Sequence, residues 1–378
     1  MPRRPSPPDE LLRAFAATPR ATGSAALHSA RQRCATELTA LGYVARERPF
    51  EFSSFPGRFG TPLIGVLSVL LMAIVAHIGA RGDRFLPLAI LAGGGVVLGL
   101  SGRWLASRGL DFLPIGRRKG VNLDARRDGD APAVWLCAHL DTKSQPVPTL
   151  VRTAGVFLLI VAGIALLALA VAAAGAGPTE GLWLGATVMT LAGGIPVVLS
   201  VVGDGSNGAL DNASGVAAVL AAAQQLGSTR GVGILITDAE ELGLAGARAW
   251  ARDARRLKVL NCDGVDDTGM INVLYTGQPP QGVLGAARAA SQRTGVPCRT
   301  RRIPVGILMD SVAFTEAGLP SVSFSRGTYR SLARVHSASD SLDNLRGTGI
   351  DETATLIAAT ARMLLGEGKT SSTEGATH

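Results

Sequence analysis

Four long apolar segments dominate the hydropathy pattern of the chain. They cover residues 61–80, 85–101, 153–177 and 181–202, and none of them contains Asp, Glu, Lys or Arg. A helix that crosses the hydrocarbon core of a bilayer needs about 20 apolar residues. Short polar connections at 81–84 and 178–180 join the segments in pairs, so we expect two transmembrane hairpins. For the short, glycine-rich segment at 85–101, a helix buried in a protein core is the alternative.

The rest of the chain has the alternating pattern of an α/β protein. Helical patterns at 24–41, 213–226, 244–255 and 281–293 alternate with extended runs at 43–52, 133–138, 231–237, 258–261 and 270–275. Strands and helices that alternate along a chain form a largely parallel sheet with helices on both faces. We therefore predict an α/β fold in which helices sandwich a mostly parallel mixed sheet, with the two transmembrane hairpins inserted into it.

The composition also indicates a chain that lies partly in lipid. Apolar residues make up 47% of the 378 residues, charged residues make up 17%, and the mean hydropathy of +0.28 is high for a soluble enzyme. After Arg3 and Arg4 the N-terminus runs into Pro and acidic residues, so we expect no cleavable signal peptide. The four cysteines have no C-x-x-C spacing, which favours reduced, buried thiols.

The net charge of +8 does not indicate a nucleic-acid partner, because the basic residues form no stripe with interleaved aromatic residues. Many of them flank the apolar segments, where contact with anionic lipid accounts for them. The hairpin turns hold only Arg81 and Arg84, whereas a larger basic set lies outside the hairpins on the side of both termini: Arg58, Arg103, Arg108, Arg117, Arg118, Lys119, Lys143 and Arg152. By the positive-inside rule, this bias predicts that the termini and the soluble parts face the cytoplasm.

Five short motifs hold residue types that bind metal ions. They are H-L-D at 139–141, D-N-A-S-G at 211–215, A-E-E-L-G at 239–243, N-C-D at 261–263 and H-S-A-S-D at 336–340. His139, Glu241 and Asp263 closely follow predicted strands, and ligands of such sheets bind at the carboxyl ends of strands. Asp211 opens a predicted helix, where the alternative role for a carboxylate is an N-cap.

Two of these motifs have a specific chemistry. Residues two apart at a strand end project to the same side, so Asp141 can accept the second ring N–H of His139 and fix the tautomer of a metal-binding imidazole. The adjacent Glu240 and Glu241 repel each other, and with a metal present one of them can bind it while the other exchanges a proton with water. Taken alone, the acidic pair can equally be a solvated loop, and a histidine in H-x-D is more often a surface residue or a hydrogen-bonded core residue.

Histidine and carboxylate ligands without cysteine suit zinc, for which cobalt or manganese can substitute. We expect two zinc ions about 3.5–4 Å apart, bridged by a carboxylate, which would lower the pKa of a shared water towards about 7. His139 and Asp211 must meet at this site. The chain must therefore cross the membrane an even number of times between them, as the second hairpin does.

Together the motifs resemble peptidase family M28, the group that contains bacterial leucyl-type zinc aminopeptidases. The similarity covers residues 24–53, 120–141 and 205–365. The resemblance implies that five residues bind the two zinc ions, with Asp211 as the bridge: His139, Asp211, Glu241, Asp263 and His336. It also implies Glu240 as general base and later general acid, supported by Asp141 and Asp340.

The chain departs from the family pattern at Met309-Asp310-Ser311, where related enzymes often read S-D-H. Ser311 replaces the histidine, and this change concerns substrate contacts and removes no metal ligand. The ligand set that the resemblance implies is complete, which argues against a cyclase with a single zinc.

The combined prediction is a membrane-anchored aminopeptidase that hydrolyses peptide or aminoacyl substrates by a metal-bound hydroxide, with Glu240 as the base. The alternatives are a hydrolase of a non-peptide amide and a noncatalytic membrane scaffold or receptor with the same fold. A transporter is disfavoured because the only ionisable residue in the apolar segments is His77. Side-chain preference, endopeptidase activity and oligomeric state stay open.

We expect six consecutive parts in this multi-pass protein of the cell membrane. They are an N-terminal part of the catalytic domain (1–60), the first hairpin (61–103), a catalytic segment with H-x-D (104–150), the second hairpin (151–203), the main catalytic segment (204–367) and a flexible tail (368–378).

Overall fold

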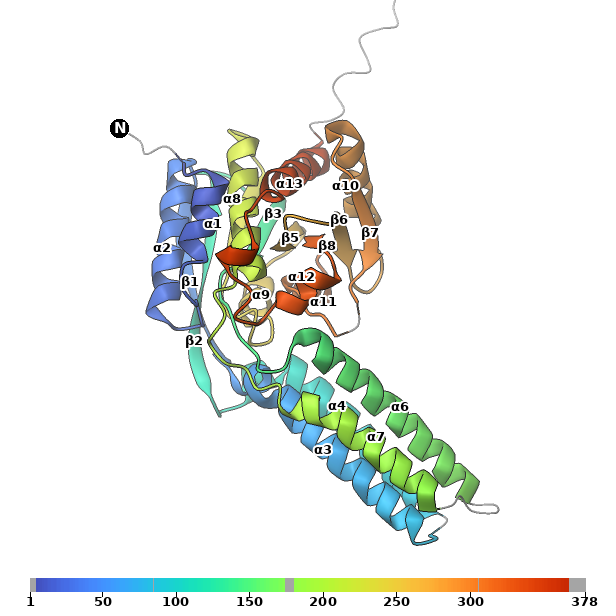
Figure 1. The fold of residues 1–378 in the computed structure, drawn as a ribbon. Coiled ribbons are helices and arrows are strands. Elements are labelled where there is room, and N and C mark those ends of the chain that lie inside the picture. Colours follow the sequence, from blue (N-terminus) through green and yellow to red (C-terminus); the bar gives the residue numbers. More distant parts are fainter. Residues whose placement is uncertain (1–4, 84, 174–179, 305, 367–378) are drawn as a thin grey trace, which may run out of the picture. The chain divides into compact units, whose positions relative to one another are not determined.

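The computed structural model describes residues 5–83, 85–173, 180–304 and 306–366 (Figure 1). The predicted tail at 368–378 lies outside the described residues. The chain forms two compact units. Unit 1 consists of Met1–Glu51, Arg118–Ser144 and Asp204–His378, and unit 2 consists of Phe52–Arg117 and Gln145–Gly203.

An eight-stranded sheet runs through unit 1 in the order β1-β2-β4-β3-β5-β8-β6-β7. The strands are β1 (Val44–Ser53), β2 (Arg117–Arg126), β3 (Val134–His139), β4 (Val232–Thr237), β5 (Lys258–Val265), β6 (Met270–Tyr275), β7 (Cys298–Arg302) and β8 (Ser321–Gly327). Strands β4, β3, β5 and β8 pair in parallel, as do β6 and β7, while β2 with β4 and β6 with β8 are antiparallel. The predicted mostly parallel mixed sheet is confirmed.

Helices cover both faces of this sheet. Those of unit 1 are α1 (Pro8–Phe15), α2 (Ala25–Ala40), α8 (Ser214–Leu226), α9 (Ala245–Ala251), α10 (Gln281–Thr294), α11 (Asp310–Glu316), α12 (Tyr329–Arg334) and α13 (Ile350–Leu365), with short helical turns η1 (Ala209–Ala213) and η2 (Leu342–Asn344). The predicted helix at 244–255 is too long, because α9 ends at Ala251. The prediction at 258–261 is too short, because β5 continues to Val265 and therefore contains Asp263.

Side chains of β3 alternate between two hydrophobic cores, because successive residues of a strand point to opposite faces of the sheet. Leu136 and Ala138 belong to the larger core, which includes buried residues of α1, α2, α8, α10 and α13. Trp135 and Cys137 point to the smaller core, beneath α9 and α11. In that core the Trp135 ring lies 5.0 Å, centroid to centroid, from the ring of Trp250. Strand β3 is fully buried and holds its C-terminal residue, His139, in a rigid frame.

Unit 2 is built around four long apolar helices, α3 (Phe55–Ala80), α4 (Leu86–Ser107), α6 (Thr149–Ala173) and α7 (Glu180–Val198), with the short α5 (Gly109–Phe112) after α4. By length and composition all four long helices can span a membrane. Large apolar side chains such as Leu100 and Leu184 are each 65% exposed, as expected for helices that face lipid.

Helices α6 and α7 approach each other closely at two glycines. A Cβ added to Gly193 would lie 2.9 Å from the carbonyl oxygen of Gly155, and one added to Gly155 would lie 2.7 Å from that of Gly193. Small residues allow such backbone contact between helices in lipid, where van der Waals packing drives association. The four helices lie side by side in Figure 1, as two consecutive hairpins.

Candidate metal centre

The central parallel strands bring three of the sequence motifs to one edge of the sheet. Strand β3 pairs in parallel with both β4 and β5, so their carboxyl ends lie together. His139 is the last residue of β3, Glu240 and Glu241 follow β4 by three and four residues, and Asp263 lies near the end of β5. All four are buried. This is the edge at which ligands of α/β sheets bind.

Two further residues reach this edge from other parts of the chain. Asp211 comes from η1, immediately before α8, and His336 follows α12. His336 has a φ of 64°, in the left-handed region that non-glycine residues seldom occupy. Such conformations concentrate at functional sites, where the surrounding structure holds them.

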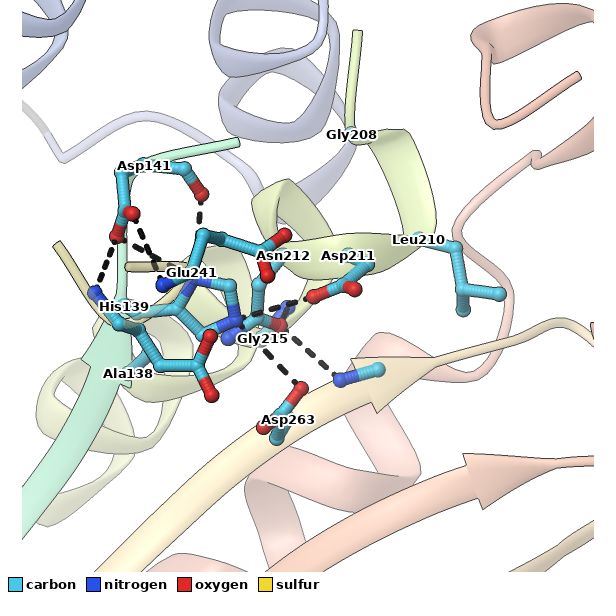
Figure 2. Close-up of polar contacts among 12 residues, drawn as sticks. Ala138, His139, Asp141, Gly208, Leu210, Asp211, Asn212, Gly215, Glu241 and Asp263 are labelled. Atoms are coloured by element: carbon cyan, nitrogen blue, oxygen red, sulfur yellow. Dashed lines mark hydrogen bonds and ion pairs between the residues drawn. The ribbon is translucent and has the colours of Figure 1, made fainter. Parts of the chain in front are cut away.

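The carboxylate of Asp211 lies between the two histidines. Its Oδ1 is 3.0 Å from Nε2 of His139, and its Oδ2 is 3.0 Å from Nε2 of His336. Nε2 of His139 also lies 3.6 Å from Oδ1 of Asp263, and Nε2 of His336 lies 3.3 Å from Oε2 of Glu241. Figure 2 shows that the His139 ring separates Asp141 on one side from Asp211 and Asp263 on the other.

Six side chains thus form two adjacent sets of donors. His139, Glu240 and Asp263 make up the first set, and Asp211, Glu241 and His336 make up the second. Within each set, one donor atom from every residue lies within 4.8 Å of the others. The five residues predicted as ligands are therefore together, and Glu240, predicted as the base, lies with the first set.

Asp141 contacts both the acidic pair and the ring of His139. Its two carboxylate oxygens accept the backbone N–H groups of Glu240 and Glu241, each at 3.1 Å. Nδ1 of His139 is 3.1 Å from the backbone carbonyl oxygen of Asp141 and 3.7 Å from its carboxylate. The ring therefore lies near both the Asp141 side chain, as expected, and the Asp141 main-chain oxygen, which is closer. Either acceptor can fix the tautomer of the ring.

The carboxylate of Asp340 holds the main chain at Asp211, as that of Asp141 holds the main chain of the acidic pair. The Asp340 carboxylate accepts the backbone N–H groups of Leu210 at 2.5 Å and of Asp211 at 3.1 Å. Burial raises the pKa of Asp340 to about 7, and the neighbouring charge of Asp211 adds to the effect. A buried carboxyl group that accepts two main-chain N–H groups fixes the direction of the chain before α8.

The surroundings shift the pKa values of the adjacent Glu240 and Glu241 in opposite directions. Burial raises the pKa of Glu240 well above its ordinary value, and the charge of Glu241 adds to this while His139 opposes it. Burial also acts on Glu241, but the charges of His336 and Lys143 outweigh it and lower the pKa of Glu241 to about 2. Neighbouring carboxyl groups whose pKa values move apart are a common sign of different roles.

The donors fit zinc by their chemistry. They are imidazole nitrogens and carboxylate oxygens without a thiolate, a combination that binds zinc in hydrolases. Oε1 of Glu241 is buried and, within the part of the chain that the structure describes, has no hydrogen-bond partner. A buried, unpaired carboxylate oxygen is costly unless a cation approaches it. Four carboxylates in one buried cluster need a similar compensation of charge.

The structure adds Lys143 to the site. Its Nζ lies 2.5 Å from Oε2 of Glu241, and its side chain is largely buried. From the sequence it was one of the basic residues that flank the hairpins, because a single lysine near an apolar segment carries no pattern of its own. Its place two residues after Asp141, in the loop that follows β3, is the one sequence signal that could have found it.

Solved structures share this fold at low sequence identity. An aminopeptidase from Aneurinibacillus sp. strain AM-1 superimposes with a TM-score of 0.54 at 12% identity, over 94% of this chain and 92% of the other. BSAP, a zinc aminopeptidase from Bacillus subtilis, gives 0.54 at 14% identity over 96% of each chain. The glutaminyl cyclase of Porphyromonas gingivalis gives 0.53 at 12% identity, over 94% of this chain and 96% of the other.

At such identities these likenesses establish the fold alone. No curated protein sequence matches the chain. The sequence model of peptidase family M28, however, matches residues 122–361, which is well over half of the chain and contains all the predicted metal ligands. The chain therefore belongs to peptidase family M28.

Proposed function

We propose that this M28 peptidase is a membrane-anchored aminopeptidase that works with two zinc ions. The observation that carries the proposal is the position of Asp211, whose two carboxylate oxygens face two histidines of different donor sets. A carboxylate in that position is suited to bridge two cations. His139 and Asp263 would hold one ion, Glu241 and His336 the other, and Asp211 both.

Zinc ions in such a site would polarise the substrate carbonyl and make a water molecule more acidic. The side chains around them supply the remaining chemistry. Glu240 stands within the first donor set and is the group placed to take a proton from the attacking water and return it to the leaving amine. Asp141 keeps Glu240 and Glu241 in position through their main-chain N–H groups.

Within the family, the choice of an aminopeptidase is supported by the solved structures that share this fold. Similar solved structures include a zinc aminopeptidase, which agrees with this choice.

Membrane anchoring is part of the proposal because of the four apolar helices. Each has the length and hydropathy of a span, and α6 and α7 form a hairpin between His139 and Asp211 in the sequence. A hairpin returns the chain to its starting side, so both residues can share one site. The distribution of arginine and lysine supports a cytoplasmic position for that site.

The deciding experiment measures metal content and hydrolysis with protein purified in detergent. We expect about two zinc ions per chain and cleavage of aminoacyl p-nitroanilides, with no cleavage of the same compounds after N-acetylation. The Glu240→Gln variant is the matched control for contaminating peptidases. Cleavage of the N-acetylated compounds would contradict the aminopeptidase assignment, while zinc binding without hydrolysis of any amide would favour the scaffold alternative.

A glutaminyl peptide serves as a separate substrate in the same assay. Release of ammonia with formation of a pyroglutamyl end, without cleavage of the p-nitroanilides, would identify cyclase chemistry and contradict the proposal.

A further inference from the structure

Arg20 is a buried arginine beside the metal centre. It lies between α1 and α2, ahead of residues 122–361 that match the family, and is 1% exposed. Burying a cation is costly, so a fully buried guanidinium requires partners for its donors. The partners of Arg20 indicate what it does.

The guanidinium of Arg20 binds two loops at once, one at residues 140–142 and the other at residues 207–208. Its Nε donates to the carbonyl oxygen of Leu140 at 2.9 Å. Its Nη1 donates to that of Asn207 at 2.8 Å, and its Nη2 to that of Gly208 at 3.1 Å. Nη1 also contacts the carbonyl oxygen of Phe15, at the end of α1. A planar group with five N–H donors can satisfy several carbonyls in fixed directions, as a lysine cannot.

The main chain of Arg20 adds two hydrogen bonds to the loop at residues 140–142. Its N–H donates to Oγ1 of Thr142 at 2.8 Å, and its carbonyl oxygen accepts the N–H of Thr142 at 3.1 Å. Thr22, two residues on, places its hydroxyl 3.4 Å from the carboxylate of Asp141. The segment at 20–22 thus runs alongside the 140–142 loop.

Both loops carry zinc ligands. Leu140 lies directly between His139 and Asp141, and Gly208 lies three residues before Asp211. Along the chain these two loops are separated by α6 and α7, so no short connection fixes their spacing. The guanidinium is a direct contact between them, through bonds that reach from residue 20 to residues 140 and 208.

The charge of Arg20 suits this position. Burial lowers its pKa to about 10, against the opposing effects of Asp340 and Asp141, so the group remains protonated at neutral pH. Asp340 holds the backbone of Leu210 and Asp211, and Asp141 holds the backbone of Glu240 and Glu241. The cation thus offsets the charge of the two carboxylates that arrange the ligand loops.

We propose that Arg20 is a positioning residue that sets the separation of the two zinc-binding sets by tying the loop of His139 and Asp141 to the loop that precedes Asp211. The inference rests on the proposed zinc centre. It predicts that loss of the guanidinium weakens zinc binding, and that a lysine does not replace it.

The test compares Arg20→Lys and Arg20→Met with a matched control, Arg31→Met. Arg31 is another buried arginine of the N-terminal part, 7% exposed, and its Nε lies 2.9 Å from Oε1 of Glu47. Four measurements are made: the melting temperature of the zinc-free protein, zinc affinity by competition with a chelator, the visible spectrum of the cobalt-substituted protein, and kcat and KM of the zinc-loaded protein.

Both Arg20 variants should lose about 10–100-fold in zinc affinity, the cost found when groups that orient ligands are removed. The cobalt spectrum should change, and kcat should fall more than KM rises. Arg31→Met should lower the melting temperature and leave zinc affinity and the cobalt spectrum as in the wild type.

Unchanged zinc affinity and spectrum in the Arg20 variants would overturn the inference, even if their melting temperatures fall. Should Arg20→Met fail to fold, Arg20→Lys decides in the same way. A wild-type protein that binds no zinc would contradict the proposed function as well. A wild type that binds zinc, with Arg20 variants that bind it equally, contradicts only the role of Arg20.

Discussion

Nζ of Lys143 lies 2.5 Å from Oε2 of Glu241, so an ammonium group neutralises a carboxylate that the second zinc ion would need. We expect Lys143→Met to bind zinc more tightly, by roughly tenfold, which corresponds to about 1.4 kcal/mol. The zinc-free variant should melt at a lower temperature than the wild type, because Glu241 loses its partner. Chelator competition and thermal unfolding measure the two effects. A fall in zinc affinity would show instead that Lys143 supports the loaded site.

A carboxylate oxygen of Asp211 lies 3.0 Å from the histidine of each donor set, so its removal should affect both proposed ions. We expect Asp211→Ala to lose most of the zinc and to reduce kcat/KM by several orders of magnitude, since metal-ion and acid–base catalysis fail together. Metal analysis after dialysis measures the first effect. Asp253→Ala, at an exposed position after α9, is the control. Full zinc content and normal turnover in Asp211→Ala would exclude the bridging role.

Glu240 and Glu241 are adjacent but should respond differently to the same substitution. Glu240→Gln cannot accept a proton, so we expect near-normal zinc content and a loss of about 10²–10⁴-fold in kcat. Glu241→Gln should lose zinc, because a neutral amide replaces a carboxylate ligand. Zinc analysis and steady-state kinetics on both variants separate the roles. The reverse pattern would mean that the base and the ligand are exchanged.

Asp310 gives the zinc-free protein a pH-dependent stability. Burial raises its pKa from 3.8 to about 7, and Oδ1 has no hydrogen-bond partner among the described residues. The folded state therefore binds the proton more tightly than the unfolded state. This contribution to stability is present below pH 3.8 and is lost as the pH rises towards 7.

Asp310→Asn removes this titration. Its melting temperature should exceed that of the wild type by more at pH 8 than at pH 5, in the presence of a chelator. The hydroxyl of Thr237, 2.5 Å from Oδ2 of Asp310, keeps an acceptor in the asparagine variant. An equal difference at both pH values would show that Asp310 does not titrate in this range.

Membrane topology can be mapped by cysteine labelling. Cys34, Cys137 and Cys262 are buried, and burial raises the pKa of Cys34 to about 12, so replacing the half-buried Cys298 by serine gives an unreactive background. We expect Arg81→Cys and Glu180→Cys, at the ends of α3 and α7, to react from outside the cell. Cysteines introduced in unit 1, such as Asp351→Cys, should react only after permeabilisation.

The double-hairpin arrangement fails if Arg81→Cys or Glu180→Cys reacts from the same side as Asp351→Cys. A complete inversion of the labelling would preserve the hairpins and place the site outside the cell.

The sequence predicted those strands and helices whose own residues show a clear hydropathy pattern. Strand β3 is a fully buried apolar run, and α3, α6 and α7 are long apolar helices. The hydropathy pattern alone therefore identifies all four elements. Strand β7 has the sequence Cys-Arg-Thr-Arg-Arg and was not predicted. It lies at the edge of the sheet, where exposed charged side chains hide the strand pattern.

The candidate site, too, was predicted only in part from the sequence. The parallel sheet predicted that His139, Glu241 and Asp263 lie at one edge, whereas the complete set with Asp211 and His336 was implied by the resemblance to family M28. Lys143 and Arg20 were not predicted as site residues, because their roles depend on contacts with Glu241 and with main-chain carbonyls far away in the sequence. Single basic residues carry no periodicity, and only the folded chain shows what they touch.

The hydrogen bonds from Arg20 to Gly208 and from Leu210 to Asp340 join residues 188 and 130 positions apart. Contacts of such long range slow folding, because a long loop must close before they can form. A ribosome-bound chain that ends before His336 lacks both this proposed ligand and the Asp340 carboxylate that holds the main chain at Asp211. The two donor sets and their main-chain support can therefore be complete only after synthesis has passed His336 and Asp340.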